Sequence, residues 1–372
     1  MRLWFAVGLI GLWLIAFGCG GGSTGSEATS ESSASTEAGG SVEGTGGVDS
    51  GVSEPSGADD AGVTEQSSVE NPPVNPKGEW KTGSVLPESQ QETAVVAFRG
   101  EIYVIGGITG SIATVKTVIA YKPETKTWRK VADLPKVMHH ANAVVLGDRI
   151  YVVGSLTPNF REQGEIYEYN PDSNTWTEKK PMPQARRRGA SALGVIDGKI
   201  YIAGGLRRGA VVDFDAYDPK TETWETKANL PTPLDHLAGG VIQGKFYVAG
   251  GRNGTITSIH PLSYQYDPAT NKWSEIAKMP TPRGGVAYAV HKGKLYVFGG
   301  EGNPAQGTQG VYREAEVYDP TTNKWTSLEP MKVPVHGTGA ASLGDFIYIP
   351  GGATKQAFGA VDAHAVFVPP AQ

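Results

Sequence analysis

The sequence predicts an all-β domain in which six repeats of about 50 residues each form one four-stranded sheet. Two observations support this prediction. The 372 residues include 50 glycines and 25 prolines, and this composition favours short strands joined by tight turns. The same aromatic and glycine residues also recur, in the same order, along the chain from Trp80 onward.

Five of the six repeats contain a glycine pair that ends an apolar strand, and in five a tyrosine follows, seven residues before a tryptophan. The glycine pairs end the strings IYVIGG, IYIAGG, FYVAGG, LYVFGG and IYIPGG, and the second repeat has IYVVGS in the same place. Asp-Pro strings such as YDPKTETW predict a turn between the last two strands of a repeat. The tryptophans are Trp80, Trp128, Trp176, Trp224, Trp273 and Trp325.

This pattern resembles the kelch motif, in which each repeat forms one blade of a β-propeller. The resemblance covers Trp80 to about Pro369 and implies a six-bladed kelch β-propeller over residues 80–372. We expect the recurring aromatic rings to fill the spaces between blades. Because Phe367 occupies the tyrosine position of the last repeat and no tryptophan follows it, the strand near Trp80 is predicted to complete the last blade.

Residues 1–18 are predicted to form a signal peptide, because Arg2 precedes an apolar run that is shorter than the ~20 residues of a spanning helix. The string Ala16-Phe17-Gly18-Cys19 resembles the lipobox of bacterial lipoproteins, which implies lipidation of Cys19, the only cysteine. An ordinary signal peptide or an uncleaved anchor is the alternative. Residue 20 is Gly and not Asp, which by resemblance to enteric sorting rules implies the outer membrane. We therefore expect an exported protein, lipid-anchored to the bacterial cell envelope, with its propeller in the periplasm or outside the cell.

Residues 19–79 are predicted to be a disordered tether that begins at the lipidated cysteine. From Gly20 to Glu79 the chain has no aromatic residue and carries 11 carboxylates against one lysine, so it cannot bury enough apolar area to fold. Removing this segment and Arg2 from the totals of 33 basic and 38 acidic residues leaves 31 against 27, or +4, from Trp80 onward. The overall charge of −5 gives no general attraction to nucleic acid.

Several kinds of enzyme site are disfavoured by the sequence. A single cysteine excludes a disulfide framework, a cysteine-based zinc site and an iron–sulfur cluster. The pattern is similar to kelch copper oxidases, but these use a Tyr–Cys crosslink, and no cysteine follows Cys19. No HExxH string is present, and the histidines show no ligand spacing. We therefore predict no cofactor and no metal.

The two ends of the propeller are predicted to differ. One end carries tight turns such as DGKI and the repeated Asp-Pro turns. The other end carries variable loops with nine of the twelve arginines and five of the seven histidines found from Trp80 onward. Arginine suits carboxylates and phosphates, and loops on a rigid scaffold commonly carry binding residues. Alternatively, these arginines pair with neighbouring carboxylates and have a purely structural role.

Two functions are compatible with this Arg/His-rich face. The first is a binding module that holds a glycan, an anionic sugar or a protein partner at the cell envelope. The second follows from a resemblance to secreted six-bladed kelch sialic-acid mutarotases, and implies a sugar-acid mutarotase or epimerase. Candidate catalytic residues, able to move protons, are Glu92, His140, His236, His336 and Glu301. Candidate ligand-binding residues, able to hold a carboxylate, are Arg188, Arg207, Arg252, Arg283 and Arg313.

Overall fold

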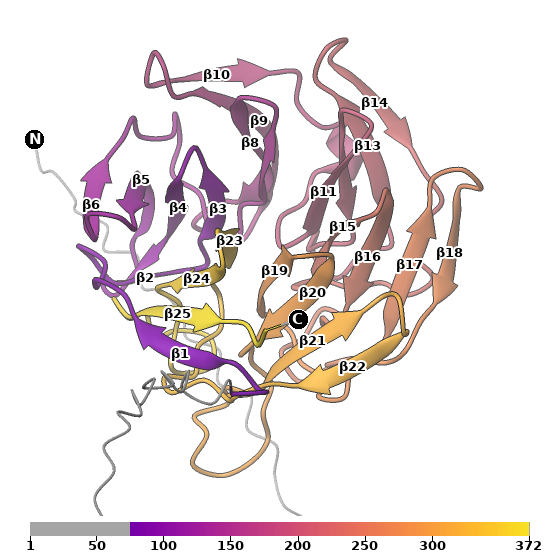
Figure 1. Cartoon of the computed structure of the whole chain (residues 1–372). Helices are drawn as coiled ribbons and strands as arrows, with labels where there is room; N and C mark the ends of the chain where they lie inside the picture. Colours follow the sequence, from indigo (N-terminus) through magenta and orange to yellow (C-terminus); the bar gives the residue numbers. More distant parts are fainter. Residues whose placement is uncertain (1–74, 372) are drawn as a thin grey trace, which may run out of the picture. The chain divides into compact units, whose positions relative to one another are not determined.

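The computed structural model of the protein describes residues 75–371, which form six antiparallel sheets around a central axis (Figure 1). The predicted all-β, six-bladed propeller is therefore confirmed. The predicted signal peptide, Cys19 and nearly all of the tether lie outside the described residues. Within residues 75–371, the one helical element is a 3-10 turn, η1 (Gln184–Arg186), and no helix there has the length and apolar character needed to cross a membrane.

Each blade has four strands, named here from the axis outward. The first blade contains β3 (Ala94–Phe98), β4 (Glu101–Thr109), β5 (Thr114–Lys122) and β6 (Thr127–Lys130), with the short β2 (Gln90–Gln91) also paired to β4. The second contains β7 (Ala143–Leu146), β8 (Arg149–Leu156), β9 (Glu162–Asn170) and β10 (Thr175–Lys179). The third contains β11 (Ala192–Ile196), β12 (Lys199–Ala203), β13 (Phe214–Asp218) and β14 (Thr223–Thr226).

The remaining blades repeat this order. The fourth contains β15 (Ala238–Ile242), β16 (Lys245–Ala249), β17 (Ser263–Asp267) and β18 (Lys272–Glu275), and the fifth β19 (Ala287–His291), β20 (Lys294–Phe298), β21 (Ala315–Asp319) and β22 (Lys324–Ser327). The sixth contains β23 (Ala341–Leu343), β24 (Phe346–Pro350), β25 (His364–Val368) and β1 (Glu79–Thr82). The innermost strands of neighbouring blades touch all the way round, including β23 with β3, so the circle is closed.

The sixth blade combines both ends of the described chain, as predicted. Strand β1 pairs antiparallel with β25, and Trp80 lies opposite Phe367 in the register. The Trp80 indole is 4% exposed and packs between Phe367 and Phe298, with ring centroids 4.8 and 5.5 Å away. The first strand therefore covers what would otherwise be an open sheet edge.

The repeated tryptophans join each blade to the one before it. In every blade the indole stacks at a tilt on the Tyr or Phe directly opposite it on the neighbouring strand, with centroids 4.8–5.3 Å apart. The indole N–H also donates to a main-chain carbonyl of the preceding blade. The acceptors for Trp80, Trp128, Trp176, Trp224, Trp273 and Trp325 are Glu329, Ser84, Ala132, Pro181, Ala228 and Ala277. The rings thus pack between blades, as expected from the sequence.

The glycine pairs occur where the second strand of a blade meets the next blade. At Gly204-Gly205, the N–H of Gly205 donates to the carbonyl of Leu234 at 2.8 Å, and a Cβ on Gly204 would lie 2.4 Å from that same oxygen. Both glycines have positive φ, 60° and 118°. Only glycine permits this close contact in this conformation.

The two ends of the propeller are built differently, as the sequence indicated. Numbering outward, tight turns join strands one to two and three to four at one end, which we call the turn end. Longer segments join strands two to three, and one blade to the next, at the other, which we call the loop end. The two sets of loops pair with each other there through isolated bridges such as His139 with Leu156 and Asp235 with Arg252.

Candidate functional site

A ring of six main-chain hydrogen bonds surrounds the axis at the loop end. Each blade contributes one residue with φ between 51° and 65°, and we call this set the axial ring. The N–H of each member donates to the carbonyl of the member before it; five of these bonds measure 2.8–3.0 Å, and the bond from Glu92 to Gly337 closes the circle. The members are Glu92, His140, Ala190, His236, Gly285 and Gly337. The ring fixes six backbone positions around one point.

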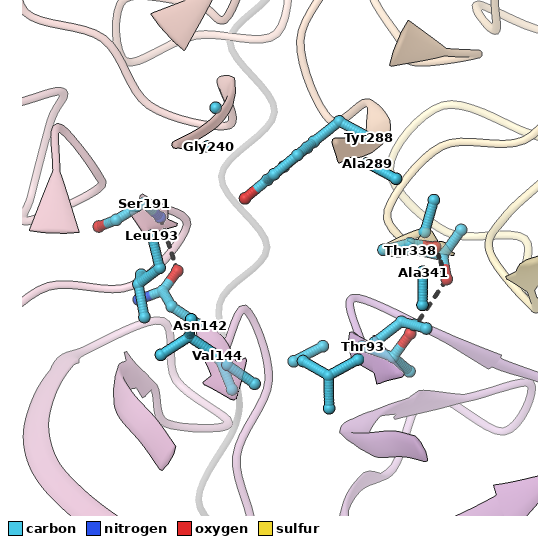
Figure 2. A pocket seen from close by; sticks show the side chains of 18 of the residues that line it. Thr93, Asn142, Val144, Ser191, Leu193, Gly240, Tyr288, Ala289, Thr338 and Ala341 are labelled. Atoms are coloured by element: carbon cyan, nitrogen blue, oxygen red, sulfur yellow. Dashed lines mark hydrogen bonds between the residues drawn. The ribbon is translucent and has the colours of Figure 1, made fainter. Parts of the chain in front are cut away.

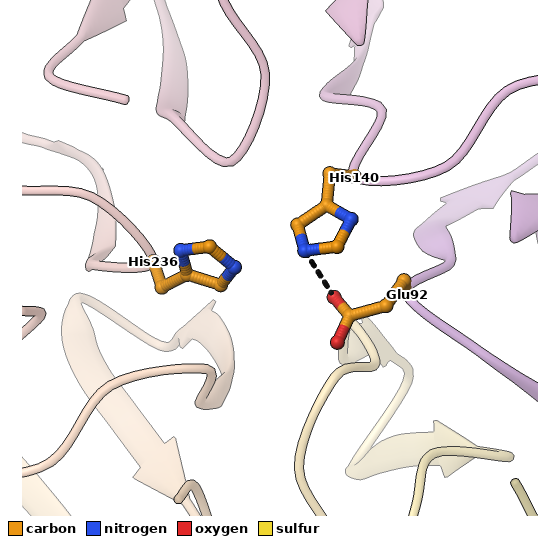
Figure 3. Close-up of side chains that lie close together, drawn as sticks. All are labelled: Glu92, His140 and His236. Carbon is orange, nitrogen blue, oxygen red and sulfur yellow. Dashed lines mark ion pairs between the residues drawn. The ribbon is translucent and has the colours of Figure 1, made fainter. Parts of the chain in front are cut away.

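Three members of the axial ring carry titratable side chains, and these converge on the axis (Figure 3). Glu92 Oε2 and His140 Nε2 are 3.2 Å apart, and the rings of His140 and His236 lie 4.8 Å apart in an edge-to-face arrangement. The side chains of Glu92, His140 and His236 are 10%, 5% and 3% exposed. The other three members, Ala190, Gly285 and Gly337, carry a methyl group or no side chain.

A second layer of charged groups supports His236. Arg252 Nη2 lies 2.9 Å from His236 Nε2, while Asp235 Oδ1 lies 2.5 Å from His236 Nδ1. Because a guanidinium can only donate, Nε2 must be the acceptor, and the neutral imidazole therefore donates from Nδ1 to Asp235. Arg252 also donates to Asp235 at 3.1 Å and to Glu301, so all three of its nitrogens have partners. Two buried carboxylates thus flank one buried guanidinium.

His336 joins this group from the last blade. Its Nε2 lies 2.7 Å from the carbonyl of Lys355, which makes Nε2 the donor and leaves Nδ1 as an acceptor in the neutral ring. Nδ1 is buried without a hydrogen-bond partner, and lies 3.7 Å from Glu301 Oε2 and 4.0 Å from Glu92 Oε1. We call Glu92, His140, Asp235, His236, Arg252, Glu301 and His336 the axial cluster. All five predicted catalytic candidates are members.

Burial shifts the protonation of the cluster away from ordinary behaviour. Burial, with the charge of Glu301, raises the pKa of Glu92 to about 8, so its carboxyl group is mostly protonated at neutral pH. Burial lowers the pKa of His140 well below its usual range, and it also lowers the pKa of His236 and His336. Burial opposes ionisation of Glu301, but the charge of Arg252 and the hydrogen bond from the N–H of Ala357 bring the net shift of its pKa downward. A neutral acid therefore faces neutral imidazoles beside a fixed ion network.

His139 extends the pair formed by Glu92 and His140. The Nδ1 atoms of His139 and His140 are 2.5 Å apart, so one donates to the other. If Glu92 gives its proton to His140 Nε2, the proton on His140 Nδ1 can pass to His139 Nδ1. His139 Nε2 is buried without a hydrogen-bond partner, so the chain of hydrogen bonds ends at this residue. Burial lowers the pKa of His139 to about 4, which agrees with a neutral ring, and Phe160 covers it at a centroid distance of 4.6 Å.

Glu92, His140 and His236 also form a geometric set of potential metal ligands, with one ligand atom from each lying within 4.8 Å of the others. The hydrogen bonds described above argue against that use. Both ring nitrogens of His236 are already hydrogen-bonded, Nδ1 to Asp235 and Nε2 to Arg252. A metal at Nε2 would have to displace the guanidinium of Arg252. The arrangement is better suited to proton transfer than to metal binding.

The axial ring lines a central cavity of about 520 Å³, and the innermost strands form the walls of this cavity. Three members of the axial cluster, Glu92, His140 and His236, line it. Figure 2 shows neutral polar side chains along these walls. Asn142 donates its amide to Val153 O and accepts from Ser191 N–H, while the Thr93 and Thr338 hydroxyls are 3.2 Å apart. Toward the turn end the walls are apolar; the valines there are Val144, Val145, Val195, Val241 and Val290.

Tyr288 extends from β19 into this cavity, facing Gly240 (Figure 2). Its hydroxyl is hydrogen-bonded to the backbone of Leu193 on β11, and burial raises its pKa to about 12. The sequence analysis did not single out this residue or the polar wall. A signal did exist, because Tyr288 is the third residue after its ring position, where the other blades have Val95, Ala143, Leu193, Gly239 and Ala340.

The structure does not gather the predicted arginines into one anion-binding pocket. Arg188 and Arg283 are fully buried within blades. Arg188 donates to the carbonyls of Gly204, Ile202 and Arg186 and pairs with Asp215 at 3.0 Å. Arg283 has the same kind of partners and pairs with Glu316 at 2.5 Å. Each guanidinium is fully buried and uses four of its five N–H donors within the propeller, so both have a structural role.

The other arginines differ from one another. Arg252 belongs to the axial cluster, and each of its three nitrogens donates to one member of that cluster, namely Asp235, Glu301 or His236. Arg207 pairs with Asp213 and donates to the carbonyl of Ala185. Arg313 is exposed at the loop end. The concentration of arginine at this end is real, but most of it neutralises carboxylates of the propeller itself.

These features define a six-bladed β-propeller with a buried acid–base cluster on its axis. The Attractin/LZTR1 β-propeller family model matches residues 76–262, half of the chain, and the KLHDC2/KLHL20/DRC7 kelch-repeat model matches residues 182–352. The chain belongs to the kelch-repeat β-propellers.

Two individual proteins illustrate the relationship. The kelch-like protein terF of Aspergillus terreus is 31% identical over 179 residues, which are 46% of this chain and 39% of that protein. The chain therefore spans about two fifths of the length of this curated relative. The solved structure of YjhT has a TM-score of 0.62 at 17% identity and covers 76% of this chain and 96% of its own. At that identity the likeness shows the fold alone.

Proposed function

We propose that this propeller binds a monosaccharide-sized ligand in its central cavity and catalyses proton transfer on it. The observation that carries the proposal is the pair formed by Glu92 and His140. A carboxyl group that stays protonated near neutral pH lies 3.2 Å from a neutral imidazole, and both groups line a 520 Å³ cavity. Perturbed acid–base groups in a cavity are typical of catalytic sites.

The reaction that fits is the ring opening of a cyclic sugar, as in a mutarotase. Glu92 gives its proton to the ring oxygen while the bond between that oxygen and the anomeric carbon breaks. His140 takes the proton of the anomeric hydroxyl on Nε2, and an open-chain carbonyl forms. Reversal of these steps on either face of the carbonyl returns one or the other anomer, so no oxidant or cofactor is consumed. Because His140 Nε2 lies 3.2 Å from Glu92 Oε2, the proton that His140 took can pass to Glu92 and restore the acid.

The test is to follow anomer exchange of a panel of sugars by magnetisation-transfer NMR with the purified domain. The wild-type protein should accelerate exchange of at least one sugar, and Glu92→Gln and His140→Gln should each lower that acceleration by roughly 10²–10⁴-fold. His291→Gln is the matched control, because His291 is also buried but does not line the cavity. No acceleration of any sugar above buffer would reject the proposed function.

A second candidate is the binding of a protein or glycan at the loop end. Every large hydrophobic side chain that is well exposed within residues 75–371 lies on a connection at this end: Val85, Ile112, Val137, Phe160, Val333 and Phe358. Such residues favour contact with another surface. Phe160→Ser with Phe358→Ser should weaken any partner that binds here without altering sugar exchange, and unchanged partner affinity would contradict this second function.

We further propose that the propeller is held at the bacterial cell envelope by a lipid on Cys19, through the acidic segment that follows. The proposal is supported by the likeness of Ala16-Phe17-Gly18-Cys19 to a lipobox and by the composition of residues 20–79. Radiolabelled fatty acid should be incorporated by the full chain and not by Cys19→Ser. Equal labelling of both proteins would contradict it.

A further inference from the structure

The wall of the central cavity offers no counter-ion to a charged ligand. Among the described residues that line it, none is a lysine or an arginine, and the one carboxyl group is that of Glu92. Burial keeps Glu92 mostly protonated at neutral pH and keeps His140 and His236 neutral. Arg252 donates to members of the axial cluster and does not line the cavity. A full charge of either sign would be buried here without a partner, which is costly.

The neutral polar side chains of the wall can exchange hydrogen bonds with hydroxyl groups. The Thr338 hydroxyl donates to Pro350 O at 2.6 Å, so Thr93 is the donor in the contact between the two hydroxyls and its own lone pairs stay open. The Asn142 amide donates one of its two N–H groups to Val153 O, which leaves the second available. A hydroxyl group can both accept and donate, whereas a carboxylate only accepts and an ammonium only donates.

Tyr288 is the only Phe, Tyr or Trp side chain among the described residues of this wall. It reaches from β19 toward β11 (Figure 2), where its hydroxyl is hydrogen-bonded to the backbone of Leu193. The innermost strand between them, β15, lines the cavity with Gly239 and Gly240, which have no side chains. Part of the Tyr288 ring packs against the core between the fourth and fifth blades, but the residue is only half-buried. The rest of the ring faces the cavity.

These groups lie in layers along the axis. Thr93 and Thr338 directly follow members of the axial ring, and Tyr288 is the third residue after Gly285, another member. At about 3.3 Å per residue, Tyr288 stands roughly 10 Å from the axial ring, on the side of the turn end. A sugar that presents its anomeric carbon to Glu92 would therefore place hydroxyl groups beside the threonines and its ring beside Tyr288.

We infer that the substrate class is a neutral pyranose, and that the apolar C–H face of its ring packs against the aromatic ring of Tyr288. The inference rests on the proposed function, which it narrows, and it revises the anionic sugar that the sequence resemblance implied. Tyr288 supplies a large apolar surface at a fixed position. It determines which sugars bind by contact with the sugar ring, at a distance from the bond that breaks.

The first experiment compares glucose, galactose and mannose, each with its uronic acid and its amino sugar, so that ring and charge vary separately. Affinity is measured by titration in saturation-transfer NMR, and anomer exchange is measured on the same samples. The best-bound neutral sugar should bind at least about tenfold more tightly than both of its charged forms.

A charged form that binds as tightly as its neutral parent, or more tightly, overturns the inference while the proposed function stands. If none of the nine sugars binds, the inference is also overturned. The proposed function is rejected separately, by the absence of faster exchange over the wider panel of sugars.

Variants of Tyr288 test the contact with the sugar ring. Tyr288→Leu should raise the Kd and the KM of the preferred sugar by about tenfold and lower kcat less, because only the stacking surface is lost. Tyr288→Phe keeps this surface and should stay within about twofold of wild type, although it loses the hydrogen bond to Leu193. Tyr247→Leu is the matched control, since Tyr247 packs in the same core cluster but does not line the cavity.

The two Tyr288 variants separate binding from a structural role. An unchanged Kd in a folded Tyr288→Leu protein overturns the inference. A Tyr288→Phe protein that loses as much affinity as Tyr288→Leu also overturns it, because the hydrogen bond and not the ring surface would then matter. If Tyr288→Leu does not fold, Tyr288→Met provides the same comparison.

Discussion

The indole of Trp80 lies opposite the ring of Phe367, with centroids 4.8 Å apart, and this contact joins the first strand of the described chain to the last. The same indole donates to the carbonyl of Glu329 in the fifth blade at 2.7 Å. One side chain therefore connects the N-terminal strand, the C-terminal strand and the neighbouring blade.

The closure of the propeller should depend on this strand. Deleting Trp80 to Val85 should lower the melting temperature sharply, because it exposes the edge of β25. Trp80→Ala should lower the free energy of unfolding by about 3–5 kcal/mol. Trp224→Ala, at the same repeat position but more exposed, should cost less. Thermal and denaturant unfolding measure both changes, and a deletion variant with unchanged melting would contradict this closure.

Arg188 should matter for stability and not for ligand binding. Arg188→Ala leaves the buried carboxylate of Asp215 without this partner and removes one donor from each of three carbonyls, so unfolding should become easier by about 3–5 kcal/mol. Ligand affinity per folded molecule should stay the same, since the guanidinium does not line the cavity. Denaturant unfolding combined with ligand titration separates these effects. A stable Arg188→Ala protein that has lost its ligand would show that the structural assignment is wrong.

Glu92 should give the fold a distinctive dependence on pH. Its pKa is about 8 in the folded protein and 4.5 in its ordinary state, so between these values the folded chain retains a proton that the unfolded chain releases. The contribution is fully present below pH 4.5 and is lost as pH rises through about 8. The buried histidines act in the opposite direction, because their lowered pKa values make stability fall as pH drops.

A difference measurement isolates this contribution. The free energy of unfolding of wild type minus that of Glu92→Gln should decrease as pH rises from 5 to 8, because only the wild type has the carboxyl group. The histidine contributions are largely common to both proteins and cancel. A flat difference across this window would mean that Glu92 is ionised throughout.

Catalysis should follow the protonated form of Glu92. If Glu92 is the acid, the acceleration of anomer exchange should be constant at neutral pH and decline above about pH 8. The decline should be absent from the residual activity of Glu92→Gln. A rate that instead rises through pH 8 would assign the carboxylate, and not the acid, to the rate-limiting step.

The architecture could be predicted because it is written into the repeats. Each blade needs aromatic side chains on its two outer strands and a close backbone contact without a Cβ at the end of its second strand. Trp, Tyr and Gly-Gly therefore recur with one period. The closure could be predicted because the repeats are irregular at both ends: no blade precedes Trp80, and no tryptophan follows Phe367. The axial ring of main-chain hydrogen bonds could not be predicted from the sequence, because its six positions hold Glu, His, Ala and Gly and so show no repeated residue type.

The sequence predicted which end of the propeller carries the candidate site, but not how the residues of the site are arranged. Arginine and histidine counts located the loop end, and the proton-transfer candidates do meet there. Which of the arginines pair with carboxylates of the propeller could not be predicted, because their partners lie on other strands. A comparison between repeats contains the missing signal: Arg188 and Arg283 occupy equivalent places, and Asp215 and Glu316 also occupy equivalent places. An acid that appears only where an arginine appears indicates an internal ion pair.

The main-chain ring on the axis has a consequence for how new activities could arise on this scaffold. Since its bonds use only amide groups, exchanging a side chain there does not remove a link between blades. Ala190 already has a φ of 52°, close to the 51° and 54° of His140 and His236. A histidine or an acidic residue could therefore be introduced at Ala190 by one substitution. The axial ring would then carry a fourth titratable side chain, and the surrounding architecture would be unchanged.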